Sequence, residues 1–279
     1  MAKGETKWHM VEEAQALEFA VGRGSQPQDL TVEVGEIAIG HGRTTIIAGP
    51  CAVEDRASFS GIARELHSLG IGLIRANLFK FRTFPSSFQG LGKDGIAILR
   101  DVKSELGIRL VSEVMSAEHV ELLADVVDMF QVGSRSMMNT SLLKELGGVG
   151  KPVLLKRMFA ATLGEFLAAA EYIARAGNMN IVLCERGVRS FDPWMRFALD
   201  VPGIALLRKL SPLPVIVDLS HSLGRKDIAA PVAKAALAAG ACGLMVEVHP
   251  DPASAKSDAE QQMSVEEFKG LLDELGPGD

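Results

Sequence analysis

Short apolar runs rich in β-branched residues recur eight times along this chain. Each run is followed by a polar loop and then by a stretch whose apolar positions have helical spacing. Runs that are apolar on both faces and alternate with helices indicate a parallel sheet covered by helices. The eight runs are 44–49, 72–78, 109–114, 129–133, 152–157, 180–186, 214–220 and 243–249. The helical stretches are 57–69, 96–106, 117–124, 142–146, 163–176, 204–210, 228–239 and 265–275.

This repeat predicts an α/β fold of the (β/α)₈ TIM-barrel class over residues 43–279, because eight strand–helix units are the number that closes such a barrel. A doubly wound open sheet is the alternative. Residues 1–42 are predicted to be an N-terminal extension, with a short amphipathic helix and loop over 1–30. A hairpin-like pair over 31–39 should lie outside the main sheet. No linker divides the chain, and we expect no fused regulatory domain.

Composition narrows the class of protein. Hydrophobic residues make up 47% of the 279 residues and charged residues 23%, as in globular proteins. The net charge of −6 argues against a general nucleic-acid or anionic-membrane surface. No apolar run is long enough to cross a membrane, and three cysteines provide no disulfide framework. We therefore expect a cytoplasmic protein.

Cations follow several of the predicted strands, although the whole chain is acidic. Active sites of TIM barrels lie at the carboxyl ends of the strands. The cations near these ends are Lys80, Arg82, Arg135, Lys156, Arg157, Arg186 and Arg189, and the acids are Glu113, Glu185 and Asp218. Thr83, Ser86 and Ser87 add hydroxyl donors beside the first two cations. This excess of cations favours a polyanionic substrate such as a phosphate ester, with salt bridging or a solvated basic loop as the alternatives.

Four metal-ligating side chains follow other strands on the same rim. They are Cys51, His221, Glu247 and Asp258. One thiol, one imidazole and two carboxylates favour a divalent transition ion, namely Mn, Fe, Co or Zn, over Mg or Ca. Each residue also has a structural alternative, such as a core thiol for Cys51 or a turn cap for Asp258. A buried unpaired carboxylate at Glu247 is harder to explain structurally, because it is costly.

Several motifs in order then point to a family. They include IIAGPCAVE (46–54), FKFRTFPSSFQGLG (79–92), QVGSRSMMN (131–139), LCERGVRSF (183–191), VIVDLSH (215–221) and GLMVEVHPDPASAKSD (243–258). From about residue 32 to residue 268, the chain resembles type I 3-deoxy-D-arabino-heptulosonate 7-phosphate synthases. The related octulosonate 8-phosphate synthases carry a different lysine loop. The resemblance implies a TIM barrel, a dimer or tetramer, and the first reaction of the shikimate pathway.

The resemblance also implies roles for individual residues. Phosphoenolpyruvate and an aldose phosphate, most simply erythrose 4-phosphate, would condense on one divalent metal ion, and inorganic phosphate would be released. We expect Lys80 to transfer a proton, with a pKa lowered by neighbouring cations. His249 would support the ligands without binding the metal. The implied metal ligands are Cys51, His221, Glu247 and Asp258, and the implied catalytic residues are Lys80, Cys51, His221 and Asp258. The implied phosphoenolpyruvate site consists of Arg75, Lys80, Arg135, Lys156 and Arg186. The implied aldose-phosphate site consists of Lys80, Arg82, Thr83 and Asp258.

The chain departs from the family pattern at residues that shape the site. The residues concerned are Ala76, Asn77, Phe81, Phe84 and Met138. For instance, Phe81 stands where the family has a proline, so the loop loses a fixed φ. These changes are explained either by ordinary drift within a normal synthase or by a paralogue that uses another aldehyde in specialised metabolism. A catalytically silent regulatory homologue is a separate alternative.

Overall fold

Eight parallel strands close into one barrel in this computed structural model, which describes residues 15–40, 44–82 and 84–276. The closed order β10-β3-β4-β5-β6-β7-β8-β9 rules out the open-sheet alternative and confirms the TIM-barrel prediction. The strands are β3 (Thr45–Gly49), β4 (Leu73–Arg75), β5 (Arg109–Val114), β6 (Met129–Val132), β7 (Val153–Lys156), β8 (Ile181–Glu185), β9 (Val215–Asp218) and β10 (Gly243–Glu247).

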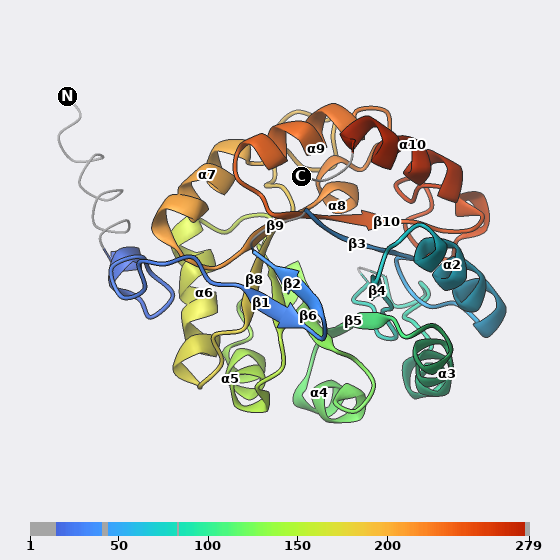
Figure 1. Ribbon diagram of the computed structural model, residues 1–279, viewed down its shortest axis with the longest axis horizontal. Helices are drawn as coiled ribbons and strands as arrows, with labels where there is room; N and C mark the ends of the chain where they lie inside the picture. The colour runs from blue at the N-terminus through green and yellow to red at the C-terminus, as the bar shows by residue number, and fades with distance from the viewer. Residues whose placement is uncertain (1–14, 41–43, 83, 277–279) are drawn as a thin grey trace.

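Helices follow the strands and surround the barrel, as Figure 1 shows. Two of them begin with capping boxes, at Thr162 with Glu165 and at Ser264 with Glu267, which satisfy otherwise unpaired N–H groups. The helices are α2 (Arg56–Ser68), α3 (Ile96–Leu106), α4 (Ala117–Leu123), α5 (Thr140–Val149), α6 (Leu163–Arg175), α7 (Val201–Leu210), α8 (Leu219–Leu223), α9 (Ala229–Ala238) and α10 (Val265–Leu275), with 3₁₀ turns at Gly92–Gly95, Ser134–Ser136 and Pro252–Ser254. None of the helices in the described ranges has the length and apolar character needed to span a bilayer.

A β-hairpin covers the amino-terminal end of the barrel. It consists of β1 (Val32–Val34) and β2 (Ile37–Ile39), which pair antiparallel and lie across the front of the barrel in Figure 1. Its buried side chains join the cluster that fills the barrel interior. The hairpin predicted over 31–39 is thus present outside the main sheet. The N-terminal helix predicted over 1–30 lies partly in residues 1–14, outside the described residues.

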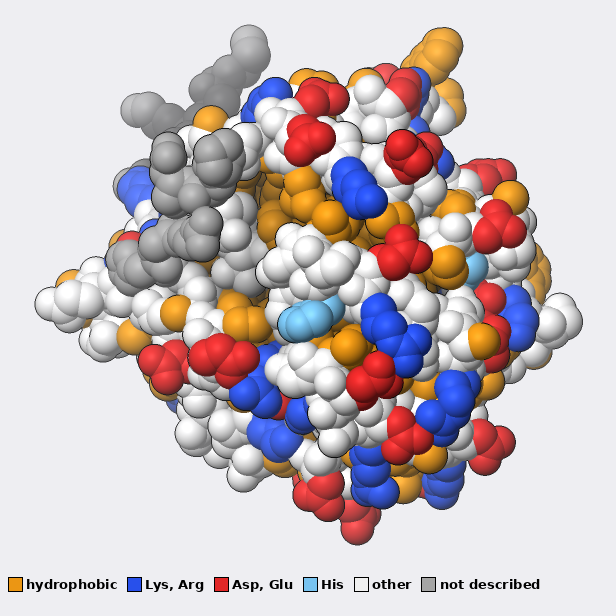
Figure 2. All heavy atoms as spheres, turned by 45° about the vertical axis from the view of Figure 1, so that its right-hand side comes forward, with side chains coloured by type: hydrophobic (Ala, Val, Ile, Leu, Met, Phe, Trp, Pro, Cys, Tyr) orange, Lys and Arg blue, Asp and Glu red, His pale blue; other side chains and the backbone are white. Residues whose placement is uncertain are grey.

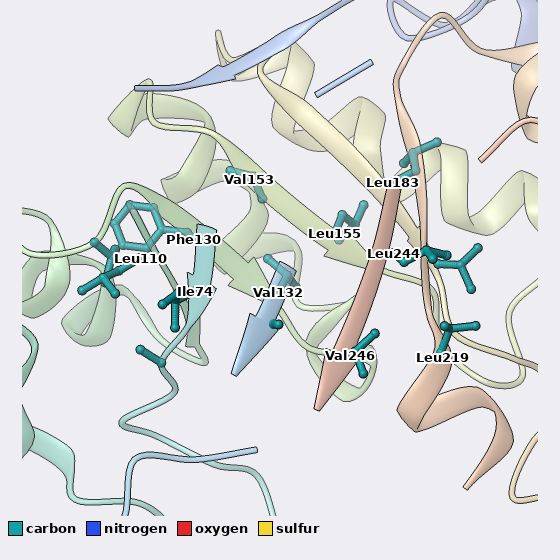
Figure 3. Packing of buried hydrophobic residues seen from close by; sticks show 14 of the residues in the cluster. Ile74, Leu110, Phe130, Val132, Val153, Leu155, Leu183, Leu219, Leu244 and Val246 are labelled. Atoms are coloured by element: carbon teal, nitrogen blue, oxygen red, sulfur yellow. The ribbon is translucent and has the colours of Figure 1, made fainter. Parts of the chain in front are cut away.

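Alternate residues of the strands face two different apolar layers. On β4, Leu73 points into the barrel and Ile74 points toward the surrounding helices. Figure 3 shows the outer layer, where residues such as Leu110 and Phe130 pack between strands and helices. The parallel strands are therefore buried on both sides, which explains their nearly continuous apolar runs.

On the face of the molecule drawn in Figure 2, basic and acidic side chains are interspersed.

Several strands end earlier than the sequence predicts, and two of these changes matter for the rim. β4 ends at Arg75, not at residue 78, and β9 ends at Asp218, not at residue 220. The Asp218 carboxylate accepts a hydrogen bond from the His221 N–H at 2.9 Å and caps the short helix α8. This cap turns the chain at the carboxyl end of β9 and brings His221 over the barrel.

Candidate active site

A cleft of about 270 Å³ lies at the carboxyl ends of the strands, at the end of the barrel away from the hairpin. Its lining contains acidic side chains from Glu113 and Asp258 and a larger group of cations. Those cations, among the described residues, are Arg75, Lys80, Arg82, Arg135, Lys156, Arg186 and Arg196. The local excess of positive charge suits an anionic substrate even though the chain is acidic overall.

The four predicted metal ligands meet beside this cleft: His221 and Asp258 line it, and Cys51 and Glu247 are fully buried next to them. Cys51 follows β3, His221 lies on α8, Glu247 ends β10 and Asp258 lies on the loop beyond β10. One ligand atom from each lies within 4.8 Å of the others. The segments that follow β3 and β9, together with the end of β10 and the loop beyond it, thus present one thiol, one imidazole and two carboxylates to a common point.

His221 is oriented by Asp218. Its Nδ1 lies 2.9 Å from Asp218 Oδ2, and its Nε2 lies 3.5 Å from Glu247 Oε1. An ionised carboxylate only accepts hydrogen bonds, so we assign the ring proton to Nδ1. Burial lowers the pKa of His221, against the opposing charges of Asp218 and Glu247. A neutral ring with a free Nε2 lone pair is the form that binds a metal, and a carboxylate partner on the other nitrogen is the usual support.

Glu247 is fully buried yet ionised. Burial by itself would raise the pKa of Glu247, but the neighbouring His221 ring and the positive charges of Arg75 and Lys80 outweigh burial and lower the pKa. Arg75 Nη2 lies 2.9 Å from Glu247 Oε1, and Gln261 donates to Oε2. The Arg75–Glu247 contact is an ion pair without hydrogen-bond geometry, so Oε1 has no hydrogen-bond partner among the described residues. A buried carboxylate oxygen in this state can also accept a bound cation.

Asp258 is held in a strained backbone conformation beside these ligands. Its φ is +48°, in the left-handed region that non-glycine residues rarely occupy. Such conformations cost on the order of 1–3 kcal/mol and concentrate at functional sites. The Cys51 thiol donates to Asp258 Oδ2 at 3.1 Å, and Lys80 Nζ lies 2.8 Å from the same oxygen.

The predicted pKa of Lys80 is wrong in direction. Burial by itself lowers it, but the contact with Cys51 and the negative charges of Glu247 and Asp258 outweigh burial and raise the pKa of Lys80 above its ordinary value. Its Nζ contacts both Cys51 Sγ and Asp258 Oδ2. The sequence argument placed Lys80 among cations, whereas the fold places its ammonium group among acids. Lys80 is therefore a protonated donor in this structure.

The residues expected to bind phosphoenolpyruvate all line the cleft, at different depths. Arg75 is buried, donates to the Pro50 and Cys51 carbonyls and pairs with Glu247. Lys156 is also buried and pairs with Asp218. Both cations are therefore held in place by the framework that also supports His221.

The outer part of the cleft contains the remaining predicted groups. Arg135 is exposed, with its Cζ 5.2 Å from the centroid of the Phe81 ring. Arg82 is half-buried and lines the same cleft, whereas Thr83 lies outside the described residues. Phe81 and Phe84, which depart from the family pattern, are 48% and 68% exposed and border the mouth.

Two predicted rim cations do not line the cleft. Arg157 pairs with Glu185 at 2.9 Å and with Asp200 at 2.8 Å, so the salt-bridge alternative holds for this arginine. Arg189 Cζ lies 4.7 Å from the centroid of the Phe159 ring. His249, expected to be a supporting residue, is buried with Nδ1 2.8 Å from the Asp251 carbonyl.

Three cleft residues were not assigned a role from the sequence. Asn77 donates to the Cys51 carbonyl and accepts from the Glu113 N–H, both at 2.9 Å, and so links two rim segments. Burial raises the pKa of Glu113, against nearby cations. Arg196 lies 3.6 Å from Asp258. Glu113 was noted only as a strand-end acid, and Arg196 lies far from the predicted strands, so only tertiary contacts reveal it.

Comparison with known proteins identifies the family. A sequence profile of the DAHP synthetase I family matches residues 15–277. The chain belongs to this family. The phospho-2-dehydro-3-deoxyheptonate aldolase of Thermotoga maritima is 44% identical over 255 residues, which are 91% of this chain and 75% of that protein. A 2-dehydro-3-deoxyphosphooctonate aldolase of Syntrophotalea carbinolica is 32% identical over 270 residues, which cover 88% of this chain and 94% of that protein.

Solved DAHP synthases also match the fold. A crystal structure of the DAHP synthase from Thermotoga maritima has a TM-score of 0.88 and 43% identity, covering 92% of this chain and 75% of that one. A truncated form of the synthase from the same organism has a TM-score of 0.84 and 41% identity, covering 91% and 94%. The resemblance inferred from the sequence motifs is therefore confirmed, and the protein is an enzyme of the carbon–carbon bond-forming DAHP synthase family.

Proposed function

We propose that this protein condenses phosphoenolpyruvate with erythrose 4-phosphate and water, giving 3-deoxy-D-arabino-heptulosonate 7-phosphate and inorganic phosphate, the first step of the shikimate pathway. The observation that carries this proposal is one cleft that joins a Cys-His-Glu-Asp cluster to converging cations. The name of the 44% identical relative supports the same reaction.

Phosphoenolpyruvate would bind to the inner cations of the cleft. Arg75, Lys156 and Arg186 are each nine-tenths or more buried, so their charges act at low effective dielectric. Arg135 would close the site from the exposed side. Together these groups can hold a phosphate and a carboxylate and offset charge that develops when C3 of phosphoenolpyruvate attacks the aldehyde carbon.

The aldose phosphate would occupy the outer part. Arg82 and Thr83 would hold its phosphate, and Asp258 would face its hydroxyl groups, since Arg82 and Asp258 line the same cleft. No contact in the described residues favours a different aldehyde, and the cations are retained beside the altered aromatic residues. The four ligands and Lys80 are also all present, which speaks against a catalytically silent homologue.

The four clustered residues fit one divalent transition ion, of Mn, Fe, Co or Zn type. Bound there, such an ion would supply Lewis acidity toward the aldehyde carbonyl. His221 would use Nε2 and keep its proton on Nδ1 against Asp218. Glu247 Oε1, which pairs with Arg75 but has no hydrogen-bond partner among the described residues, would bind the ion at the same time.

Lys80 would supply the proton for the new hydroxyl group. Its raised pKa keeps the proton on Nζ, and Asp258 Oδ2 holds that nitrogen at 2.8 Å between the ligand cluster and the cleft. As C3 bonds to the aldehyde carbon, the carbonyl oxygen gains negative charge and can take this proton. Water then adds at C2, and the resulting phosphohemiketal loses inorganic phosphate.

The direct test is phosphate release from phosphoenolpyruvate plus erythrose 4-phosphate with Mn²⁺, before and after chelation. We expect release that needs both substrates, stops on chelation and returns with added metal. No phosphate release with erythrose 4-phosphate, while phosphoenolpyruvate still binds, would show that erythrose 4-phosphate is not the acceptor.

We further propose that the protein is cytoplasmic and forms a homodimer or homotetramer. Cell fractionation would test the location, and sedimentation would test the oligomeric state.

A further inference from the structure

Two buried arginines at the ends of neighbouring strands are held in different ways. Arg157, after β7, donates to the carboxylates of Glu185 and Asp200 and to the Ala161 carbonyl. Arg186, after β8, is equally buried, with 5% of its surface exposed, but its Nε and Nη1 have no hydrogen-bond partner among the described residues. Only Arg186 lines the cleft. Arg186 therefore carries unpartnered N–H groups at the wall of the cleft.

An aromatic ring, rather than a carboxylate, packs against Arg186. The Arg186 Cζ lies 4.1 Å from the centroid of the Phe197 ring. The Phe159 ring stacks on Phe197 with centroids 5.4 Å apart and an interplanar angle of 25°. A cation over an aromatic face is attracted without being neutralised, and its N–H edge stays free for an anion. A carboxylate in the same place would compete with an anionic substrate.

The backbone fixes the position of this ring from two sides. The Phe197 N–H donates to the Ser222 carbonyl at 2.8 Å, and Ala198 forms a two-way bridge with Val188. Gly187 has a φ of +86°, and a Cβ built on it would lie 2.8 Å from Phe197 Cβ. The close approach therefore requires glycine at position 187. These contacts hold the Phe197 ring in the wall of the cleft, although Phe197 lies in an irregular loop.

Phe197 also contacts a second cation, but less closely. Arg196 Cζ lies 5.9 Å from the ring centroid. Arg196 is held independently, because it donates to Gln261 and lies 3.6 Å from Asp258. Removal of the ring should therefore affect Arg186 first and leave the Asp258 side of the cleft in place.

We propose that Phe197 is a positioning residue for phosphoenolpyruvate: its ring holds the Arg186 guanidinium in the cleft wall and leaves the free N–H groups for an anionic group of the substrate. This inference rests on the proposed function and adds a residue that does not touch the reacting atoms. It predicts an effect on phosphoenolpyruvate binding rather than on the chemical step.

The test compares Phe197→Leu with Phe197→Tyr in full steady-state kinetics and in direct titration with phosphoenolpyruvate. Loss of the ring face should raise the KM for phosphoenolpyruvate about fivefold to tenfold. The kcat and the KM for erythrose 4-phosphate should stay within about twofold, and tyrosine should restore binding because it keeps the ring face. Phe191→Leu is the matched control, since Phe191 lies on the same loop with its ring fully exposed.

The combined variant shows whether the ring acts through Arg186. In an Arg186→Gln background, Phe197→Leu should cause no further loss in phosphoenolpyruvate affinity, because the cation that the ring holds is gone. Additive losses would overturn the inference, as would an unchanged KM in Phe197→Leu. If the wild-type protein binds no phosphoenolpyruvate, the proposed function fails and this inference fails with it. If the wild type turns over normally and the variant matches it, only this inference fails.

Discussion

Asp218 connects His221 to Lys156 through a single buried carboxylate. Its Oδ1 accepts the His221 backbone N–H at 2.9 Å, and its Oδ2 lies 2.9 Å from His221 Nδ1 and contacts Lys156 Nζ. One side chain thus caps α8, orients a candidate metal ligand and holds a cation of the proposed phosphoenolpyruvate site. The Asp218 side chain therefore connects His221, a candidate metal ligand, to Lys156, a candidate phosphoenolpyruvate-binding residue.

Asp218→Asn should weaken both metal binding and phosphoenolpyruvate binding. The amide cannot carry the charge that opposes Lys156 or fix the ring proton on His221 Nδ1. We expect metal affinity to fall about 10- to 100-fold, as is typical for supporting residues, and the KM for phosphoenolpyruvate to rise. Equilibrium dialysis with Mn²⁺ and initial rates would measure these changes. Asp227→Asn, at an exposed aspartate paired with Arg225, should change neither.

Lys80→Met tests the proton-donor role. Methionine keeps much of the length and packing of lysine but has no proton to donate. We expect kcat to fall about 10²- to 10⁴-fold, with phosphoenolpyruvate still bound in direct titration. Lys93→Met, at an exposed lysine paired with Glu118, is the control. Turnover that survives in Lys80→Met with only weakened binding would remove Lys80 from the chemical step.

Cys51→Ser tests the ligand cluster. Serine replaces the thiol with a poorer ligand for a borderline-soft ion. We expect metal affinity to fall by more than the roughly 10- to 100-fold carried by supporting residues, and activity to fall with it. Metal content after dialysis would show the loss. Cys242→Ser, at a cysteine that donates to the Val215 carbonyl at the other end of the strands, should retain metal. Equal metal content in both variants would exclude Cys51 as a ligand.

The pKa of His221 predicts the pH range in which the protein loses stability and bound metal. Burial lowers this pKa from 6.5, so the folded chain takes up the proton at a lower pH than the unfolded chain does. Stability from His221 is therefore fully present above pH 6.5 and declines as pH falls through the folded pKa. Metal binding should follow the same direction, because protonation removes the Nε2 lone pair. Bound Mn²⁺ measured from about pH 8 to about pH 5 should be constant at first and fall only below 6.5. Loss of bound metal on raising the pH above 6.5 would contradict this.

Ile39→Ala should destabilise the barrel without altering the site. Ile39 lies on the hairpin and is fully buried in the cluster that fills the barrel interior. Removing its side chain should cost about 2–5 kcal/mol in the free energy of unfolding, measured by urea denaturation. The KM values should be unchanged because the cleft lies at the opposite end. Glu33→Ala, at an exposed position of the same hairpin, should stay within about 0.5 kcal/mol of wild type.

The strands could be predicted from the sequence because a strand that is buried on both faces consists almost entirely of apolar residues. Residues such as Leu73 and Ile74 pack into different apolar layers, so the whole run must be apolar. The end of β9 could not be predicted in the same way. Leu219 continues the apolar pattern beyond Asp218, but the Asp218 cap starts a helix there. A side-chain hydrogen bond thus overrides the periodicity.

The composition of the site was largely visible in the sequence, whereas its electrostatics were not. The rim position of Cys51, His221, Glu247 and Asp258 followed from the strand ends, and the family resemblance grouped them as ligands. The direction of the Lys80 pKa shift was wrong because its neighbours come from distant loops. Arg157 was grouped with the substrate cations, yet Glu185 and Asp200 hold it.

The sequence by itself determined the barrel, the end of the barrel that carries the site and the types of side chain gathered there, because periodicity and strand order are properties of the chain. Only the tertiary structure decided which charges face one another. Lys80 points to Asp258, a contact between distant segments that barrel closure brings together, and Arg186 packs on Phe197 through the path of the loop between β8 and α7. A charge interaction depends on distance and on burial, and neither quantity is contained in residue order.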